Sequence, residues 1–186
     1  MNKIRLAMLL FVASEAVFFI LLMIAYVVYH VTSPSAADAS RYLDIPRTAA
    51  FSVALFSSSF TMWRTGVKFR TGRPRPALAW LAATIALGAS FLVGEGTEYA
   101  SLIRKNVTVG RDLFGTTFFT LTGFHGLHVF IGLIMLAALF GIGLKRGTAI
   151  ASGKLDGALE GITIYWHFVD SVWIFIFTIV YLWALR

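Results

Sequence analysis

The sequence predicts an all-α integral membrane protein, a single transmembrane domain over residues 1–186 that crosses the bilayer five times. Three observations lead to this prediction. Of the 186 residues, 58% are apolar and only 13% are charged, which is more apolar surface than one soluble core of this size covers. The apolar residues gather in stretches of membrane length. Tyrosines and tryptophans lie toward the ends of these stretches. Strands are excluded because an open sheet leaves backbone groups unpaired in lipid.

Five uncharged or nearly uncharged stretches define the expected helices. They cover residues 6–29, 48–63, 77–93, 113–144 and 161–185. Helices are expected over about residues 5–30, 47–64, 77–103, 113–144 and 160–185. Since about 20 residues make a membrane-length helix, the second stretch is short and needs Arg47 and Arg64 to extend their charged ends to the membrane surface. The fourth stretch is longer than needed and is expected to tilt or to project from the bilayer.

Aromatic residues near the ends of these stretches are interpreted as an interfacial belt. They are Tyr26, Tyr29, Trp63, Trp80, Tyr99, Tyr165, Trp166, Tyr181 and Trp183.

Basic residues set the expected orientation. The formal net charge is +7, and the Lys and Arg residues lie between apolar stretches, where lipid headgroups explain them better than nucleic acid does. The more basic side of the membrane holds Lys3, Arg5, the basic residues of 64–75, Lys145, Arg146 and Lys154. The positive-inside rule places this side and the N-terminus in the cytoplasm, and the C-terminus outside. The chain has no cysteine, which excludes thiolate metal sites and a thiol nucleophile.

Ionisable residues inside the expected helices need a partner or a function. With a rise of about 1.5 Å per residue, five of them fall in the inner half of the membrane and could meet there. They are Glu15, His125, His128, His167 and Asp170. The two histidines of the fourth helix are three residues apart and share a face. Glu95 and Glu98 lie at the outer end of the third helix and are expected to stay apart from this cluster.

Three interpretations of the cluster are open from its chemistry. Imidazoles and carboxylates could hold Fe, Cu or Zn, although the matched Glu-x-x-His pairs of di-metal bundles are missing. The same groups could pass protons, which would suit Glu15. The third interpretation, favoured for the histidines and Asp170, is that they pair with one another and fix helix packing. Glu98, next to Tyr99, is interpreted as an interfacial carboxylate near Arg104 and Lys105.

Four segments, in order and nearly from end to end, resemble subunit III of the haem–copper oxidases. SEAVFF at 14–19 resembles the family's Ser-Glu-x-x-Phe-Phe segment, and EY at 98–99 is similar to its Glu-Tyr at the outer end of a helix. FGTTFF at 114–119, followed by TGFHGLHV at 122–129, is close to the family's most characteristic stretch. YWHFVDSVW at 165–173 matches its closing helix. Four such segments in the right order and spacing are highly specific.

The resemblance implies the family's five-helix bacterial form, a bundle that matches the last five helices of the seven-helix subunit III fold. In the seven-helix form the Ser-Glu-x-x-Phe-Phe segment lies on the third helix, whereas here it lies on the first. In seven-helix members lipid occupies a cleft between the two leading helices and the rest. A bound phospholipid in the same place would therefore need a neighbouring subunit to complete its site.

The resemblance also implies a non-redox subunit of a respiratory terminal oxidase, with no catalytic residue, metal ligand or cofactor of its own. Haem and copper are expected in partner subunits, which are the catalytic subunit I, with subunit II and further subunits. The complete enzyme is expected in the bacterial inner membrane, where it reduces O2 to water and pumps protons. Glu15 matches the family's buried, carbodiimide-reactive carboxylate, and we expect it to support proton uptake. His125, His128, His167 and Asp170 are expected to be structural partners.

Some alternatives stay open at this point. The electron donor is cytochrome c or quinol, because docking of the donor belongs to other subunits. A subunit III-like protein associated with nitric oxide reductase would share the same pattern. An autonomous di-metal membrane enzyme is the rival from a different class.

Overall fold

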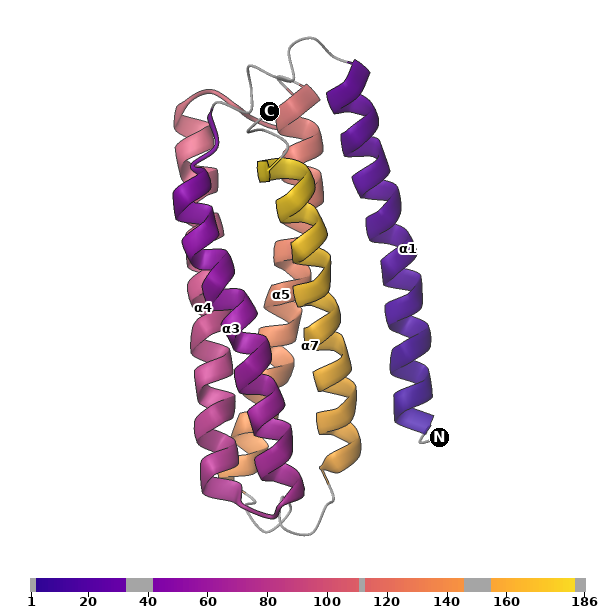
Figure 1. Ribbon diagram of the computed structural model, residues 1–186, viewed down its shortest axis with the longest axis vertical. Coiled ribbons are helices and arrows are strands. Elements are labelled where there is room, and N and C mark those ends of the chain that lie inside the picture. Colours follow the sequence, from indigo (N-terminus) through magenta and orange to yellow (C-terminus); the bar gives the residue numbers. More distant parts are fainter. Residues whose placement is uncertain (1–2, 33–41, 111–112, 146–154, 183–186) are drawn as a thin grey trace.

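The computed structural model describes residues 3–32, 42–110, 113–145 and 155–182. Long helices run up and down side by side, and each is antiparallel to the one before it (Figure 1). In chain order they are α1 (Lys3–Thr32), α3 (Ile45–Arg70), α4 (Pro74–Arg104), α5 (Leu113–Lys145) and α7 (Asp156–Phe177), and the π-helix η2 (Thr178–Leu182) continues α7. The start of α1 and the end of η2 therefore lie at opposite ends of the bundle (Figure 1).

Local sequence signals explain where several helices begin and end. The Asp44 side chain accepts a hydrogen bond from the Arg47 N–H at 3.3 Å and caps the start of α3. Gly72 adopts a left-handed conformation with φ of 64° in the short turn after α3, and Pro74 then begins α4. After α4, Asn106 has φ of 63°, a conformation that asparagine tolerates better than most residues with a side chain.

Trp166 of α7 lies at the centre of the bundle, in a notch between two glycines. Its side chain is fully buried, and its Nε1–H donates to Ser58 Oγ of α3 at 3.0 Å. A Cβ atom at Gly88 of α4 would lie 2.7 Å from the indole ring, and one at Gly132 of α5 would lie 2.9 Å from it. One large side chain thus joins α3, α4, α5 and α7, because the two glycines leave room for it.

Helix α1 lies at one edge of the bundle, where it packs against α5 and α7 (Figure 1). Only Phe19, Tyr26 and Tyr29 of this helix are buried. Large apolar side chains such as Leu10 and Leu21 are more than half exposed. Such a surface is stable against lipid or against another membrane protein, and it is too apolar for water.

The number of membrane crossings differs from the prediction. Within the described parts of the chain, four helices are long and apolar enough to cross a membrane: α1, α4, α5, and α7 together with η2. The prediction of five transmembrane helices is therefore wrong, because the second expected span lacks the required apolar character. A helix does form there, but α3 carries many serines and threonines as well as Arg47 and Arg64.

The polar residues of α3 have partners on the neighbouring helices. Ser52 Oγ accepts a hydrogen bond from the Trp173 Nε1–H of α7 at 2.8 Å. Thr61 Oγ1 lies 2.8 Å from Thr84 Oγ1 of α4. These hydroxyl groups are buried, so α3 contributes hydrogen bonds between helices and is correspondingly less apolar than its neighbours.

The interfacial-belt interpretation fails for several aromatic residues. Four of them are buried, with at most 2% of each residue exposed: Tyr26, Tyr165, Trp166 and Tyr181. Trp63, in contrast, is exposed as a belt residue would be. Buried aromatic residues fill space between helices and bring one polar atom with them. Residues 146, 154 and 183–185, which the sequence assigned to the basic side, the belt and the last helix, lie outside the described residues.

Candidate functional site

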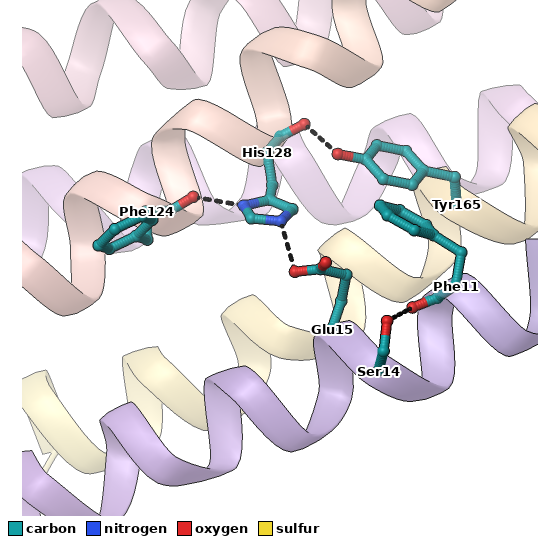
Figure 2. Close-up of polar contacts among 6 residues, drawn as sticks. All are labelled: Phe11, Ser14, Glu15, Phe124, His128 and Tyr165. Carbon is teal, nitrogen blue, oxygen red and sulfur yellow. Dashed lines mark hydrogen bonds and ion pairs between the residues drawn. The ribbon is translucent and has the colours of Figure 1, made fainter.

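Glu15 of α1 points toward His128 of α5, and the two side chains form the polar contact shown in Figure 2. Glu15 Oε2 lies 3.1 Å from His128 Nε2. Both side chains are mostly buried, with 22% of Glu15 and 11% of His128 exposed. The contact joins residues 113 positions apart in the chain, and it anchors the edge helix α1 to the body of the bundle.

The other ring nitrogen of His128 determines what this contact means chemically. His128 Nδ1 lies 2.7 Å from the backbone carbonyl oxygen of Phe124, and a carbonyl can only accept, so Nδ1 carries the proton. A neutral imidazole then presents a lone pair at Nε2. One proton is therefore shared between Nε2 and Glu15 Oε2, either as a carboxylic acid that donates to His128 or as an ion pair.

Aromatic rings surround this pair and limit the access of water. The Phe19 ring packs edge-on against His128 at 5.0 Å between ring centroids. Tyr165 stacks beside the imidazole, and its hydroxyl donates to the His128 carbonyl oxygen at 3.0 Å (Figure 2). Phe11 stacks on Tyr165 in turn. The shared proton thus lies in apolar surroundings, where electrostatic interactions are stronger than in water.

His167 and Asp170 of α7 form a second polar cluster, together with Ser59 of α3. The Ser59 hydroxyl donates a hydrogen bond to Asp170 Oδ2, and its oxygen lies 3.0 Å from His167 Nδ1. Since a hydroxyl has one proton, Ser59 accepts from the His167 N–H when it donates to Asp170. These contacts hold α3 against α7.

His125 lies apart from both clusters, inside a cage of aromatic rings. It is fully buried, and its imidazole stacks on Trp173 with ring centroids 4.9 Å apart. Phe91 and Phe19 contact its edges. Neither ring nitrogen has a hydrogen-bond partner among the described residues, which is an uncommon state for a buried polar side chain.

A third set of polar contacts lies on the C-terminal half of α4, the half expected to face outward. Tyr99 Oη lies 3.0 Å from Glu95 Oε1 and 2.7 Å from Thr122 Oγ1 of α5. The Tyr181 hydroxyl of η2 donates to Glu98 Oε2 at 2.7 Å. Both glutamates are buried, so Glu98 is not the interfacial carboxylate that its sequence position indicated.

The five inner residues that were expected to meet are therefore distributed over separate contacts. Glu15 pairs with His128, His167 lies with Asp170, and His125 has only aromatic neighbours. Over the described residues, no three His, Cys, Asp or Glu side chains lie together as a metal site requires. The arrangement is suited to sharing protons and to holding helices together.

Sequence reasoning missed the partners that complete these contacts. The contacts of Ser59 were not predicted, and Tyr165 and Tyr181 were interpreted as interfacial belt residues. A serine within a helical segment gives no sequence signal of which neighbouring helix it contacts. The aromatic residues did carry one signal, since a tyrosine inside a long apolar helix needs a partner for its hydroxyl group.

The fold and its contacts define a class of protein: a polytopic membrane protein whose buried polar side chains pair between helices. Comparison with known proteins identifies the family. Residues 1–185 match the family described as cytochrome c oxidase subunit III, and the chain belongs to that family. It is a subunit III of the terminal-oxidase type.

Curated relatives include subunits of two kinds of oxidase. Cytochrome c oxidase subunit 3 of Synechocystis sp. is 33% identical over 174 residues, which cover 93% of this chain and 72% of the relative. A probable cytochrome c oxidase subunit 3 of Mycobacterium leprae is 29% identical over 97% of this chain and 88% of the relative. Cytochrome bo(3) ubiquinol oxidase subunit 3 of Pseudomonas aeruginosa is 34% identical over 85% of this chain and 73% of the relative.

Proposed function

We propose that this chain is the non-redox subunit III of a haem–copper terminal oxidase, and that the Glu15–His128 pair supports proton uptake by the catalytic subunit beside it. Haem and copper belong to the partner subunits, and the complete enzyme reduces O2 to water. The electron donor follows from those partners, since the relatives include subunits of both cytochrome c and quinol oxidases.

The observation that carries the proton role is the fixed tautomer of His128. Because Nδ1 donates to the Phe124 carbonyl, only Nε2 can exchange a proton with Glu15. A single proton between a carboxyl group and an imidazole can move with little rearrangement of the heavy atoms. Glu15 keeps 22% of its side chain exposed, and it lies on the edge helix. A group on a neighbouring subunit can therefore reach this carboxyl.

The distribution of charge supports an orientation in a bacterial cytoplasmic membrane. At one end of the bundle α1 begins, α3 passes into α4, and α5 ends (Figure 1). The basic residues at this end are Arg5, Arg70, Arg73, Arg75 and Lys145. The positive-inside rule places this end on the cytoplasmic side. Anionic lipid headgroups on that side also favour it.

The test compares Glu15→Gln and Glu15→Ala with Glu160→Gln as a control, in the intact oxidase. Glu160 is a carboxylate at the surface of α7 that pairs with Arg5. All three complexes should contain this chain and show the haem spectrum of the wild type. Oxygen consumption by both Glu15 variants should decline over fewer turnovers than in the wild type, because neither side chain can release a proton.

Two outcomes would contradict the proposal. If Glu15→Gln, which can still hydrogen-bond to His128, is lost from the complex, the pair serves packing. If both Glu15 variants sustain oxygen consumption for as long as Glu160→Gln does, the proton role is wrong.

A further inference from the structure

Two glutamates on the outer half of α4 face a cavity inside the bundle. Glu95 and Glu98 are 9% and 6% exposed. The cavity between them has a volume of about 10 Å³ and is also lined by Thr48 of α3 and Trp173 of α7. This is about the smallest volume that holds one water molecule, and the carboxyl groups offer it polar partners.

The hydrogen bonds beyond Glu95 fix where its neighbours' protons lie. The Thr122 hydroxyl donates to the Phe118 carbonyl oxygen at 2.8 Å, which uses its single proton. Thr122 Oγ1 therefore accepts from the Tyr99 hydroxyl 2.7 Å away. The proton of Tyr99 is then also used, although Tyr99 Oη lies 3.0 Å from Glu95 Oε1.

With the protons of Thr122 and Tyr99 already used, the contact between Glu95 and Tyr99 is a hydrogen bond only if Glu95 supplies the proton. Carboxyl group, phenol and threonine hydroxyl then donate in one direction and end on a backbone carbonyl. Successive donors in one direction strengthen each other. All the observed contacts are satisfied together when Glu95 is a neutral carboxylic acid.

Within the part of the chain that the structure describes, no basic side chain pairs with either carboxyl group to favour its ionised form. Of the ion pairs in the described residues, none includes Glu95 or Glu98. The Glu95 carboxyl lies against Gly126 of α5, where a Cβ atom would be 2.5 Å from Oε2. An unpaired charge at this depth is strongly unfavourable. Glu98 accepts from Tyr181, while its Oε1 atom has no partner among the described residues.

We propose that Glu95 and Glu98, with one water molecule between them, form a proton-binding site on the outer half of the bundle. Glu95 holds the proton and donates a hydrogen bond to Tyr99. The water molecule occupies the cavity and donates to Glu98 Oε1. Both glutamates lie on α4, whereas Glu15 lies on α1 and His128 on α5, and the proposal stands independently of the function proposed for that pair.

Infrared spectra of the intact oxidase in H2O and D2O test the proposal through the carbonyl stretch of a protonated carboxyl group. Glu95→Gln should remove one such band, and Glu160→Gln should leave it unchanged. The chain should stay in the complex at the wild-type level, because the glutamine amide donates to Tyr99 as the carboxylic acid does. Glu95→Leu, which cannot donate, should be retained less well.

A spectrum in which Glu95→Gln removes no such band would overturn the proposal, since Glu95 would then be ionised. Tyr99→Phe provides the same test with Glu95 in place. Loss of its acceptor should move the band of Glu95 to higher frequency, and an unmoved band contradicts the hydrogen-bond chain. A gain in thermal stability on adding Na⁺ or K⁺ that Glu95→Gln abolishes would show a cation site and overturn the proton assignment.

Discussion

Adding one methyl group beside Trp166 tests the packing of the bundle centre. In Gly132→Ala the new Cβ atom would lie 2.9 Å from the indole ring and 3.3 Å from the Tyr165 ring. Both distances are shorter than ordinary contacts between carbon atoms. Trp166 cannot simply move away, because Gly88 of α4 also lies against its ring and its Nε1–H is bonded to Ser58.

The expected magnitude follows from overpacking of a filled core. Inserting a methyl group where the neighbouring side chains cannot move aside lowers the free energy of unfolding by about 1–3 kcal/mol. Replacing glycine by alanine in a helix also stabilises it by up to about 1 kcal/mol, so a matched control is needed. Gly141 lies on the same helix, and a Cβ atom there would meet no atom within 4 Å. Gly132→Ala should therefore be less stable than Gly141→Ala by about 1–3 kcal/mol, roughly 5- to 160-fold in the unfolding equilibrium.

Unfolding in mild detergent by added dodecyl sulfate, followed by tryptophan fluorescence, measures this difference. The midpoint of Gly132→Ala should move to a lower fraction of dodecyl sulfate, and that of Gly141→Ala should stay at the wild-type value or rise slightly. Gly88→Ala should behave like Gly132→Ala, because its Cβ atom would lie 2.7 Å from the same ring. If the Gly132 and Gly141 variants unfold at the same midpoint, the notch around Trp166 is not a tight contact and the reasoning fails.

Three further predictions use the same unfolding assay or simple chemical analysis. Ser59→Ala should destabilise the bundle by about 1–3 kcal/mol, because it leaves a buried carboxyl group on Asp170 without its donor. The control is Ser57→Ala, at an exposed residue that bonds only to its own helix, and it should change the midpoint little. Equal effects of the two substitutions would refute the pairing of α3 with α7. Tyr181→Phe should lower stability by a similar amount, since Glu98 loses its donor, and an unchanged midpoint would show that the contact contributes nothing. Metal analysis of the purified chain should find no stoichiometric Fe, Cu or Zn, and a stoichiometric content would contradict the assignment of a subunit without its own metal.

Much of the architecture follows from hydrophobicity, and its failure at α3 has a physical reason. Apolar length identifies α1, α4, α5 and α7, because lipid contact demands apolar side chains over a whole span. Helix α3 carries Ser52 and Ser58 to hydrogen-bond two buried tryptophans. Polarity inside a bundle and polarity at a membrane surface look the same along a sequence. Only the neighbouring helices distinguish them.

The site was predictable in its residues but only partly in its pairings. Residue depth placed Glu15 and His128 at a similar level, and the structure joins them. Depth alone also grouped His125 with them, although its ring faces Trp173 and Phe91. Depth along a helix follows from counting residues, whereas direction around the axis depends on how each helix is rotated in the bundle. That rotation is set by contacts such as the Trp166 notch, which involve residues far apart in the sequence.

The edge position of α1 has a consequence for the order of biosynthesis. α1 leaves the ribosome before the other described helices, yet the helices that it packs against, α5 and α7, follow much later. During that interval Glu15 lies in the bilayer without its imidazole partner. A half-made chain thus displays an unpaired carboxyl group that a finished chain does not. The pairing of Glu15 with His128 must wait until α5 has been made, after α3 and α4.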